Sequence, residues 1–381
     1  MGFDRELFAS KLQRYCGQLD VSFEELSAGT GIAQNRIRSL IDQVSDPTGD
    51  EVLIFADYFK CDFKFFISNE KLAPFEQTEL LFRRHNDEIS KADRWSVQNF
   101  LYLCECESFL YSELGIEPKS FKFVKSGKNY KQHGRDAARS LRKKLDYAPN
   151  AIPKDVYRDL RTIGIHVFRR VLENSNISGL YIKHPVAGPS VLINYTEDVY
   201  RQRFSAAHEA AHAILDGTDD FSVSFSKYDK SSLVETRANT FAAEYLIPRE
   251  TLELYSKKFS WTYPVVTKFA SELMVNVKPL LIALKENKFI TDESFRKMSN
   301  IQLAKDIKID PEISHYFSTK TQYRAQFLLK HGLSDYYVEL CFEAHEKGVI
   351  SLGRMSEMLL MTPRQVNDLA RLLGKALAYG Y

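Results

Sequence analysis

The sequence contains no apolar run that approaches the roughly 20 residues of a membrane-spanning helix, so we expect no membrane segment. Its five cysteines are scattered and no signal peptide is evident, which predicts a cytoplasmic protein in a reducing compartment. There is no internal repeat or low-complexity segment. The net charge of +2 indicates no class of partner, while 44% hydrophobic residues in 381 suffice for the cores of two or three domains.

One short segment, His208-Glu209-Ala210-Ala211-His212, has the residue types and spacing of a metal-dependent hydrolase. Histidines four residues apart share one face of a helix, so both imidazoles can bind a single metal ion. Such an ion lowers the pKa of its bound water from about 15.7 toward roughly 7, and Glu209 would accept the proton. The alternative is two surface histidines on an amphipathic helix. The small alanines beside the ionisable residues favour the metal site, because they let an ion and a substrate approach closely.

A catalytic zinc ion takes a third protein ligand in addition to water. Asp216 lies one turn beyond His212, but a straight helix carries it away from the ion. Glu235 begins a second helical pattern over residues 234–248. The residues alone leave four acidic candidates: Asp216, Asp219, Asp220 and Glu235.

Two separated segments resemble the ImmA/IrrE family of zinc metallopeptidases. One is residues 203–207, directly before the metal motif, and the other runs from Glu235 through residues 239–242 to 246–248. Asn194 also matches the end of the family's strand before the catalytic helix. The resemblance covers roughly residues 135–255. Ala210-Ala211 replace a bulkier residue and a glycine, which changes no reactive group.

The resemblance implies a function for each polar residue of the motif. It implies that His208, His212 and Glu235 bind Zn²⁺, or alternatively Mn²⁺, and that Glu209 is the general base. Around this site the sequence predicts a helix over 137–145, a strand over 163–168 and two strands within 180–193. His166 and His184 are expected to be ordinary strand or loop residues. His184 and Tyr245 remain alternatives for polarising the scissile carbonyl.

The N-terminal region predicts a pair of short helices joined by a tight turn. Ser22-Phe23-Glu24-Glu25 forms a capping box, Gly31 lies in the turn, and the second helix covers 34–41. The pattern resembles the XRE (lambda-repressor-like) DNA-binding domains, in which the second helix of the helix-turn-helix enters the major groove. The resemblance implies DNA contacts from Gln34, Asn35, Arg36 and Arg38.

The charge of this region leaves a second interpretation open. Residues 1–68 carry seven basic and eleven acidic side chains, a net of −4, although DNA binding depends on phosphate neutralisation. A module that binds protein is therefore the alternative. Under the DNA-binding interpretation, we expect a single domain to bind weakly and homodimerisation to strengthen the binding. Residues 119–144 instead carry ten basic side chains and one acid, Asp136, with interleaved aromatic rings. We interpret that segment as a junction between modules, with nucleic-acid contact as the alternative.

The sequence as a whole predicts a mainly α multidomain protein. We expect a helix-turn-helix domain in 1–70, a helical spacer and basic linker in 71–134, a small α+β zincin-like peptidase core in 135–255 and a helical region of unassigned role in 256–381. A further helix-turn-helix-type pair is expected within 348–366.

Two functions follow as expectations. The first is a transcription-linked zinc endopeptidase that cleaves a helix-turn-helix repressor or partner protein in mobile-element, stress or phage-defence regulation. The second is a DNA-binding antitoxin or repressor whose metallopeptidase-like domain binds a partner toxin without obligatory proteolysis. The intact Glu209 favours the enzyme, because a binding scaffold does not need a general base.

Overall fold

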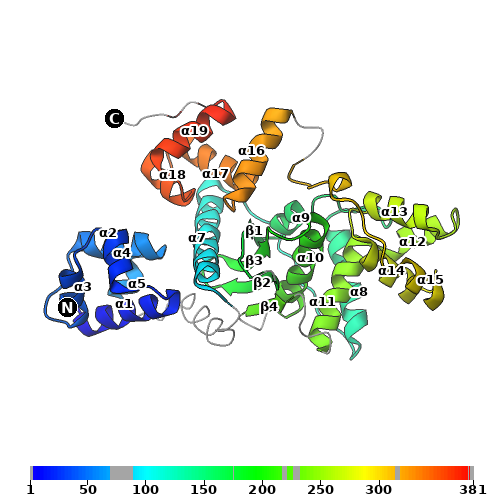
Figure 1. The fold of residues 1–381 in the computed structure, drawn as a ribbon, viewed down its shortest axis with the longest axis horizontal. Coiled ribbons are helices and arrows are strands. Elements are labelled where there is room, and N and C mark those ends of the chain that lie inside the picture. The colour runs from blue at the N-terminus through cyan, green and yellow to red at the C-terminus, as the bar shows by residue number, and fades with distance from the viewer. Residues whose placement is uncertain are drawn as a thin grey trace. The chain divides into compact units, whose positions relative to one another are not determined.

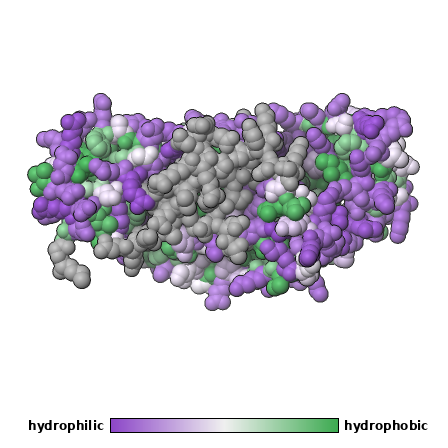
Figure 2. Space-filling model, turned by 90° about the horizontal axis from the view of Figure 1, so that it is seen from below, coloured by the Kyte–Doolittle hydropathy of each residue, from purple (hydrophilic) through white to green (hydrophobic). Residues whose placement is uncertain are grey.

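The computed structural model describes residues 3–68, 89–174, 176–216, 221–225, 232–313, 318–375 and 377. They form two compact units, one made of residues up to 105 with 172–174 and the other of 106–171 with the residues from 176 onward. Both units are mainly helical, and the described strands all belong to the second (Figure 1). In the part of the chain that the structure describes, no helix has the length and apolar character needed to span a membrane. The described surface in Figure 2 is mainly hydrophilic, with apolar side chains in small spots.

The first unit begins with five helices. They are α1 (Arg5–Leu19), α2 (Phe23–Thr30), α3 (Gln34–Ile41), α4 (Gly49–Phe59) and α5 (Lys64–Ile67). The predicted capping box is confirmed: the backbone N–H of Glu25 donates to Ser22 Oγ over 3.1 Å, and the Ser22 N–H donates to the Glu25 carboxylate over 2.8 Å. Gly31 closes α2 with a φ of 73°, so the turn takes place at the glycine that the sequence indicates. A longer helix, α7 (Lys91–Leu114), follows.

The second unit contains a four-stranded sheet. Its strands are β1 (His166–Arg170), β2 (Ile177–His184), β3 (Gly188–Asn194) and β4 (Phe221–Phe225), in the order β1-β3-β2-β4. β1 is parallel to β3, whereas β2 is antiparallel to both β3 and β4. The two strands predicted within 180–193 are confirmed. The predicted strand over 163–168 begins later, because Ile163 closes the helix α9 (Val156–Thr162) and Gly164 has a φ of 83°.

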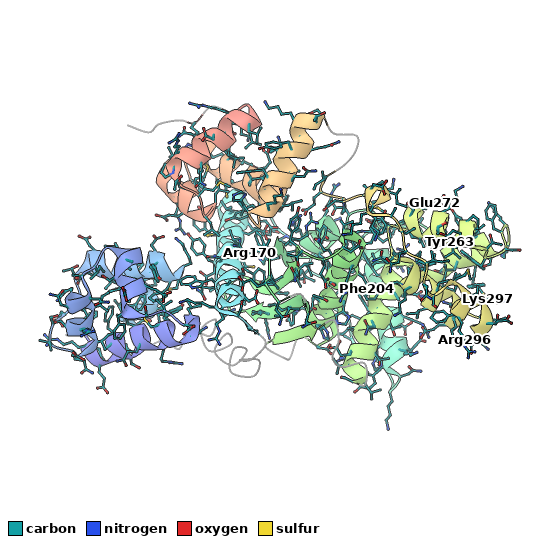
Figure 3. All side chains as sticks on the ribbon, in the orientation of Figure 1. Arg170, Phe204, Tyr263, Glu272, Arg296 and Lys297 are labelled. Carbon is teal, nitrogen blue, oxygen red and sulfur yellow. The ribbon has the colours of Figure 1, made fainter. Side chains whose placement is uncertain are left out.

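The helix α10 lies on the sheet, and two further helices that pack behind it help to position the site (Figure 1). α10 (Val199–Leu215) packs against β2 and β3, α11 (Leu233–Leu246) packs against α10, and α8 (Tyr130–Lys144) packs against α11. Ala207 and Ala211 of α10 are completely buried, and Phe204 is partly buried against the same core (Figure 3).

The start of α10 is held by a residue from much later in the chain. Asp198 is the N-cap and accepts hydrogen bonds from the N–H groups of Tyr200 and Arg201. Lys308 Nζ donates to the other Asp198 oxygen over 2.6 Å, so the segment around Lys308 is tied to the beginning of α10. Gly217, predicted to stop the helix, lies outside the described residues.

The remaining helices surround this core or follow it. They are α12 (Arg249–Ser256), α13 (Tyr263–Glu272), α14 (Val277–Glu286), α15 (Asp292–Met298), the 3₁₀ helix η1 (Lys305–Ile307), α16 (Thr319–Lys330), α17 (Asp335–Glu346), α18 (Leu352–Met358) and α19 (Pro363–Leu373). Within the helical region expected over 256–381, α13 and α14 are separate helices, because Met274 between them has a φ of 55°. α18 and α19 are the two helices expected near the C-terminal end of the sequence.

Gly134 allows α8 to lie very close to α11. A Cβ at this position would lie 2.5 Å from the carbonyl oxygen of Arg237 and 2.9 Å from the backbone nitrogen of Phe241. Both obstacles are backbone atoms of a helix, which cannot rotate away. We therefore expect Gly134→Ala to destabilise the second unit by at least the roughly 1–3 kcal/mol typical of overpacking, measured by thermal unfolding. Gly17→Ala in α1 is the matched control, because no atom lies within 4 Å of its added methyl group. Equal melting temperatures for the Gly134 variant and the wild type would contradict this close approach.

Candidate metal centre

Three side chains bring possible metal ligands together: one ring nitrogen from each of His208 and His212, and the carboxylate of Glu235. His208 Nε2 lies 3.2 Å from His212 Nε2 and 3.2 Å from Glu235 Oε2, and His212 Nε2 lies 3.3 Å from Glu235 Oε1. Ligands about 2.0–2.1 Å from a tetrahedral zinc ion are separated from one another by roughly 3.3 Å. The three separations therefore fit a zinc ion. Within the described residues, this is the group of histidine, cysteine and acidic side chains whose geometry suits a metal ion.

The local fold brings these residues together. His208 and His212 lie one turn apart on α10, and Glu235 lies in the first turn of α11, which Ser232 caps by accepting a hydrogen bond from Val234 N–H. Both histidines are buried, while the Glu235 side chain is 20% exposed. The open side of the cluster is therefore at the carboxylate.

The Glu235 carboxylate of the cluster is ionised. Burial by itself raises the pKa of Glu235, but hydrogen bonds to His208 and His212 and the charges of these two rings outweigh it, so the pKa lies well below its usual range. Glu235 is then a carboxylate at neutral pH. Two imidazole nitrogens and an ionised carboxylate are a ligand set that zinc prefers.

Each histidine is held from its other ring nitrogen. His208 Nδ1 lies 3.2 Å from Asn239 Oδ1, and His212 Nδ1 lies 3.0 Å from Asp216 Oδ2. An acceptor at Nδ1 fixes the proton there and leaves the Nε2 lone pair for the metal. Asp216, one of the four candidates for third ligand, thus contacts the nitrogen opposite the cluster. Asp219 and Asp220 lie outside the described residues.

Glu209 lies next to His208 on α10, and its side chain is fully buried. Gly179 of β2 makes room for it, because a Cβ on Gly179 would lie 3.2 Å from Glu209 Cγ and 3.0 Å from the carbonyl oxygen of Leu192. Gly179 was not predicted from the sequence to lie at the site. An isolated glycine inside a strand was the available signal, since it often marks a close approach.

Other titratable residues considered from the sequence have structural partners. The Tyr245 hydroxyl donates to Asp159 over 2.6 Å, and His184 Nδ1 accepts from Val186 and Ala187 N–H groups in the turn between β2 and β3. His166 Nδ1 lies 2.5 Å from the Glu107 carboxylate in the core. We assign none of these side chains a role at the metal.

The residues expected to contact DNA lie on α3 and are not equally accessible. Asn35 and Arg38 are exposed, and Gln34 is partly exposed. The Arg36 guanidinium instead donates to the Glu51 carboxylate over 2.7 and 2.8 Å, to Ser45 Oγ over 2.6 Å and to the Asp46 carbonyl over 2.8 Å. In this unit Arg36 therefore connects α3 to α4.

Two histidines and a glutamate arranged around one point, with a buried glutamate beside them, form a candidate site for a metal ion. Residues 160–294 match the model of the IrrE N-terminal-like domain, the M78 peptidase family. The chain is 35% identical over 100 residues to the radiation response metalloprotease IrrE of Deinococcus radiodurans, covering 25% of this chain and 30% of that protein. The protein of the same name from Deinococcus deserti is also 35% identical over 100 residues, covering 25% and 36%.

The chain thus contains an IrrE-like metallopeptidase domain, for which a metal cofactor is implied. The expected resemblance of the peptidase region is confirmed, although the matched residues begin and end later than 135–255. The match spans about a third of the length of the two relatives. The assignment of the N-terminal helices to the XRE domains stays a prediction.

Proposed function

We propose that this protein is a zinc-dependent endopeptidase, with Mn²⁺ as the alternative ion, that cleaves a helix-turn-helix repressor or a partner protein. The observation that carries the proposal is the convergence of His208, His212 and Glu235 beside the buried Glu209. Cleavage of a repressor would switch on genes of a mobile element, a stress response or phage defence. The likeness to a radiation response metalloprotease supports a regulatory rather than a digestive protease.

The bound ion would supply a Lewis acid and a water molecule of lowered pKa. His208, His212 and Glu235 would hold it, and Asn239 and Asp216 would keep the Nε2 lone pairs directed at it. The Glu209 carboxylate would accept the proton of the attacking water and pass it to the nitrogen of the departing amine. Its burial on α10 keeps that carboxylate in a fixed position.

The test uses the purified chain and the product of the adjacent gene. We expect zinc- or manganese-dependent cleavage at one site, seen by mass spectrometry, and its loss with a chelator. A stable complex in which neither protein is cleaved under any metal condition would contradict the protease. That outcome would favour the second candidate, an antitoxin-like binding protein. The net charge of −4 in residues 1–68 is the observation that favours a protein partner.

We also propose that α2 and α3 form a helix-turn-helix that binds DNA weakly as a single domain and more tightly in a homodimer. Arg38→Ala should weaken binding to the protein's own promoter by about 1–3 kcal/mol if it contacts a base, measured by gel-shift titration at fixed salt. Arg36→Ala should chiefly lower the melting temperature of the first unit, because it removes the bridge to Glu51, Ser45 and Asp46. Unchanged DNA binding by the Arg38→Ala variant and by a variant that combines Arg36→Ala with Arg38→Ala would rule out α3 as the DNA-reading helix.

A further inference from the structure

The carboxylate that holds His212 is itself held by two further residues. Asp216 Oδ2 faces His212 Nδ1 at 3.0 Å, and Asp216 Oδ1 forms an ion pair with the guanidinium of Arg237 on α11. That guanidinium lies over the ring of Tyr130, 5.1 Å from its centre, at the first residue of α8. Side chains from α10, α11 and α8 therefore form one series of contacts that ends at the metal ligand.

This series is shielded from water. Asp216 is 7% exposed and Arg237 is 5% exposed. Separating an ion pair that is removed from solvent is costly, because each partner would be left as a buried charge without compensation. The Tyr130 ring covers the guanidinium with the negative face of its π system, which adds a cation–π contact. Arg237 therefore fixes Asp216 in the rotamer that faces His212.

The segment before α8 is attached to the same end of α10. Lys125 Nζ donates to the carbonyl of Leu215, the residue next to Asp216, over 2.6 Å. His133 Nε2 lies 2.9 Å from the Ser126 carbonyl, and Phe121 and Phe123 pack against the core of the second unit. The sequence suggested a linker here. The structure instead fastens residues 121–130 along the peptidase core.

We propose that Tyr130 and Arg237 are positioning residues which, through Asp216, hold His212 for the metal, so that the docked segment 121–130 sets the metal affinity of the site. The proposal rests on the proposed metal centre. It also gives that centre a means of regulation. A partner that detaches segment 121–130 from the core would separate Tyr130 from Arg237, so that Asp216 would hold His212 less firmly. Contacts to metal ligands of this kind change metal affinity by about 10–100-fold when they are removed.

The test measures zinc affinity by competition with a chromophoric chelator, using the full chain. Arg237→Gln and Asp216→Asn should each weaken zinc binding by about 10–100-fold. Combining the two should weaken it little further, since both act on the same nitrogen of His212. Tyr130→Ala should weaken it less, and Tyr130→Phe should restore the wild-type value because the ring face is kept. The Co²⁺-loaded chain supplies a second readout, since its visible spectrum should change in the Arg237 and Asp216 variants.

Arg139→Gln is the matched control. Arg139, like Arg237, is an arginine that connects α8 with α11. It lies on α8 and donates to Glu244 of α11 over 2.8 Å, but this ion pair does not involve His212. It should lower stability slightly and leave zinc affinity unchanged. The proposal is overturned if Arg237→Gln binds zinc like the wild type, if Arg139→Gln weakens binding equally, or if Tyr130→Phe behaves like Tyr130→Ala. A wild-type chain that takes up no metal would overturn both this proposal and the metal centre. A chain that binds zinc and cleaves nothing would contradict only the proposed protease activity. The zinc affinities of the variants would still decide whether Tyr130 and Arg237 position His212.

Discussion

Glu209→Gln should nearly abolish peptide hydrolysis while the zinc content of the protein stays unchanged. The substitution keeps the shape of a fully buried side chain, but it removes the carboxylate that we propose as the acceptor of the proton from the attacking water. Loss of a positioned general base typically lowers the rate by about 10²–10⁴-fold. The measurement pairs the cleavage rate of the partner protein with zinc content determined by mass spectrometry.

Glu244→Gln is a suitable control, because it converts another buried glutamate, on α11, to an amide without touching the metal cluster. It should cleave at close to the wild-type rate. In cells, the Glu209 variant should leave the target genes off if the protein acts by destroying a repressor. Full complementation by a zinc-loaded Glu209→Gln protein would end the protease hypothesis and support action by binding.

Glu235→Ala should release the metal. Two histidines remain, which are too few to hold zinc in a catalytic geometry, and their Nε2 atoms then face each other at 3.2 Å without a carboxylate. We expect the zinc content to fall well below one ion per chain after dialysis, whereas the wild type retains its ion. Asp216→Ala is the comparison, because it removes a carboxylate that also lies within hydrogen-bond distance of His212, at 3.0 Å, but at the other ring nitrogen.

At saturating zinc the Asp216 variant should load fully, with a reduced affinity. The reverse result, in which Asp216→Ala empties the site and Glu235→Ala does not, would show that the ligand set is wrong. Thermal unfolding of both variants with and without zinc would confirm the ranking, because a ligand that binds only the folded state raises its melting temperature.

The parts of the site that follow from local spacing were predictable. Residues four positions apart lie on the same face of a helix, so the sequence alone indicated that His208 and His212 form a pair. Glu235 lies on another helix and was selected only through the family pattern, since four acidic residues fitted the need for a third ligand. The contact of Tyr130 with Arg237 had no sequence signal, because it depends on how α8 crosses α11.

The same division holds for the fold. The two strands within 180–193 have a local signal in their residues, but the order β1-β3-β2-β4 does not, because pairing is decided by tertiary contacts. The break between α13 and α14 was also unpredictable. Met274 takes a positive φ there, a conformation that glycine or asparagine usually announces and methionine does not.

The anchoring of α10 at both ends bears on how such a protein can be rearranged during evolution. Its first residues are tied to Lys308 and its last to Lys125, and both lysines lie outside the stretch 160–294 that matches the IrrE-like domain. The part that is recognisable by similarity is thus smaller than the part that holds the helix in place. A gene fusion joining only that stretch to a new regulatory module would inherit the ligands without their supports. Recombination that preserves a working metal site must therefore carry the flanking segments with it.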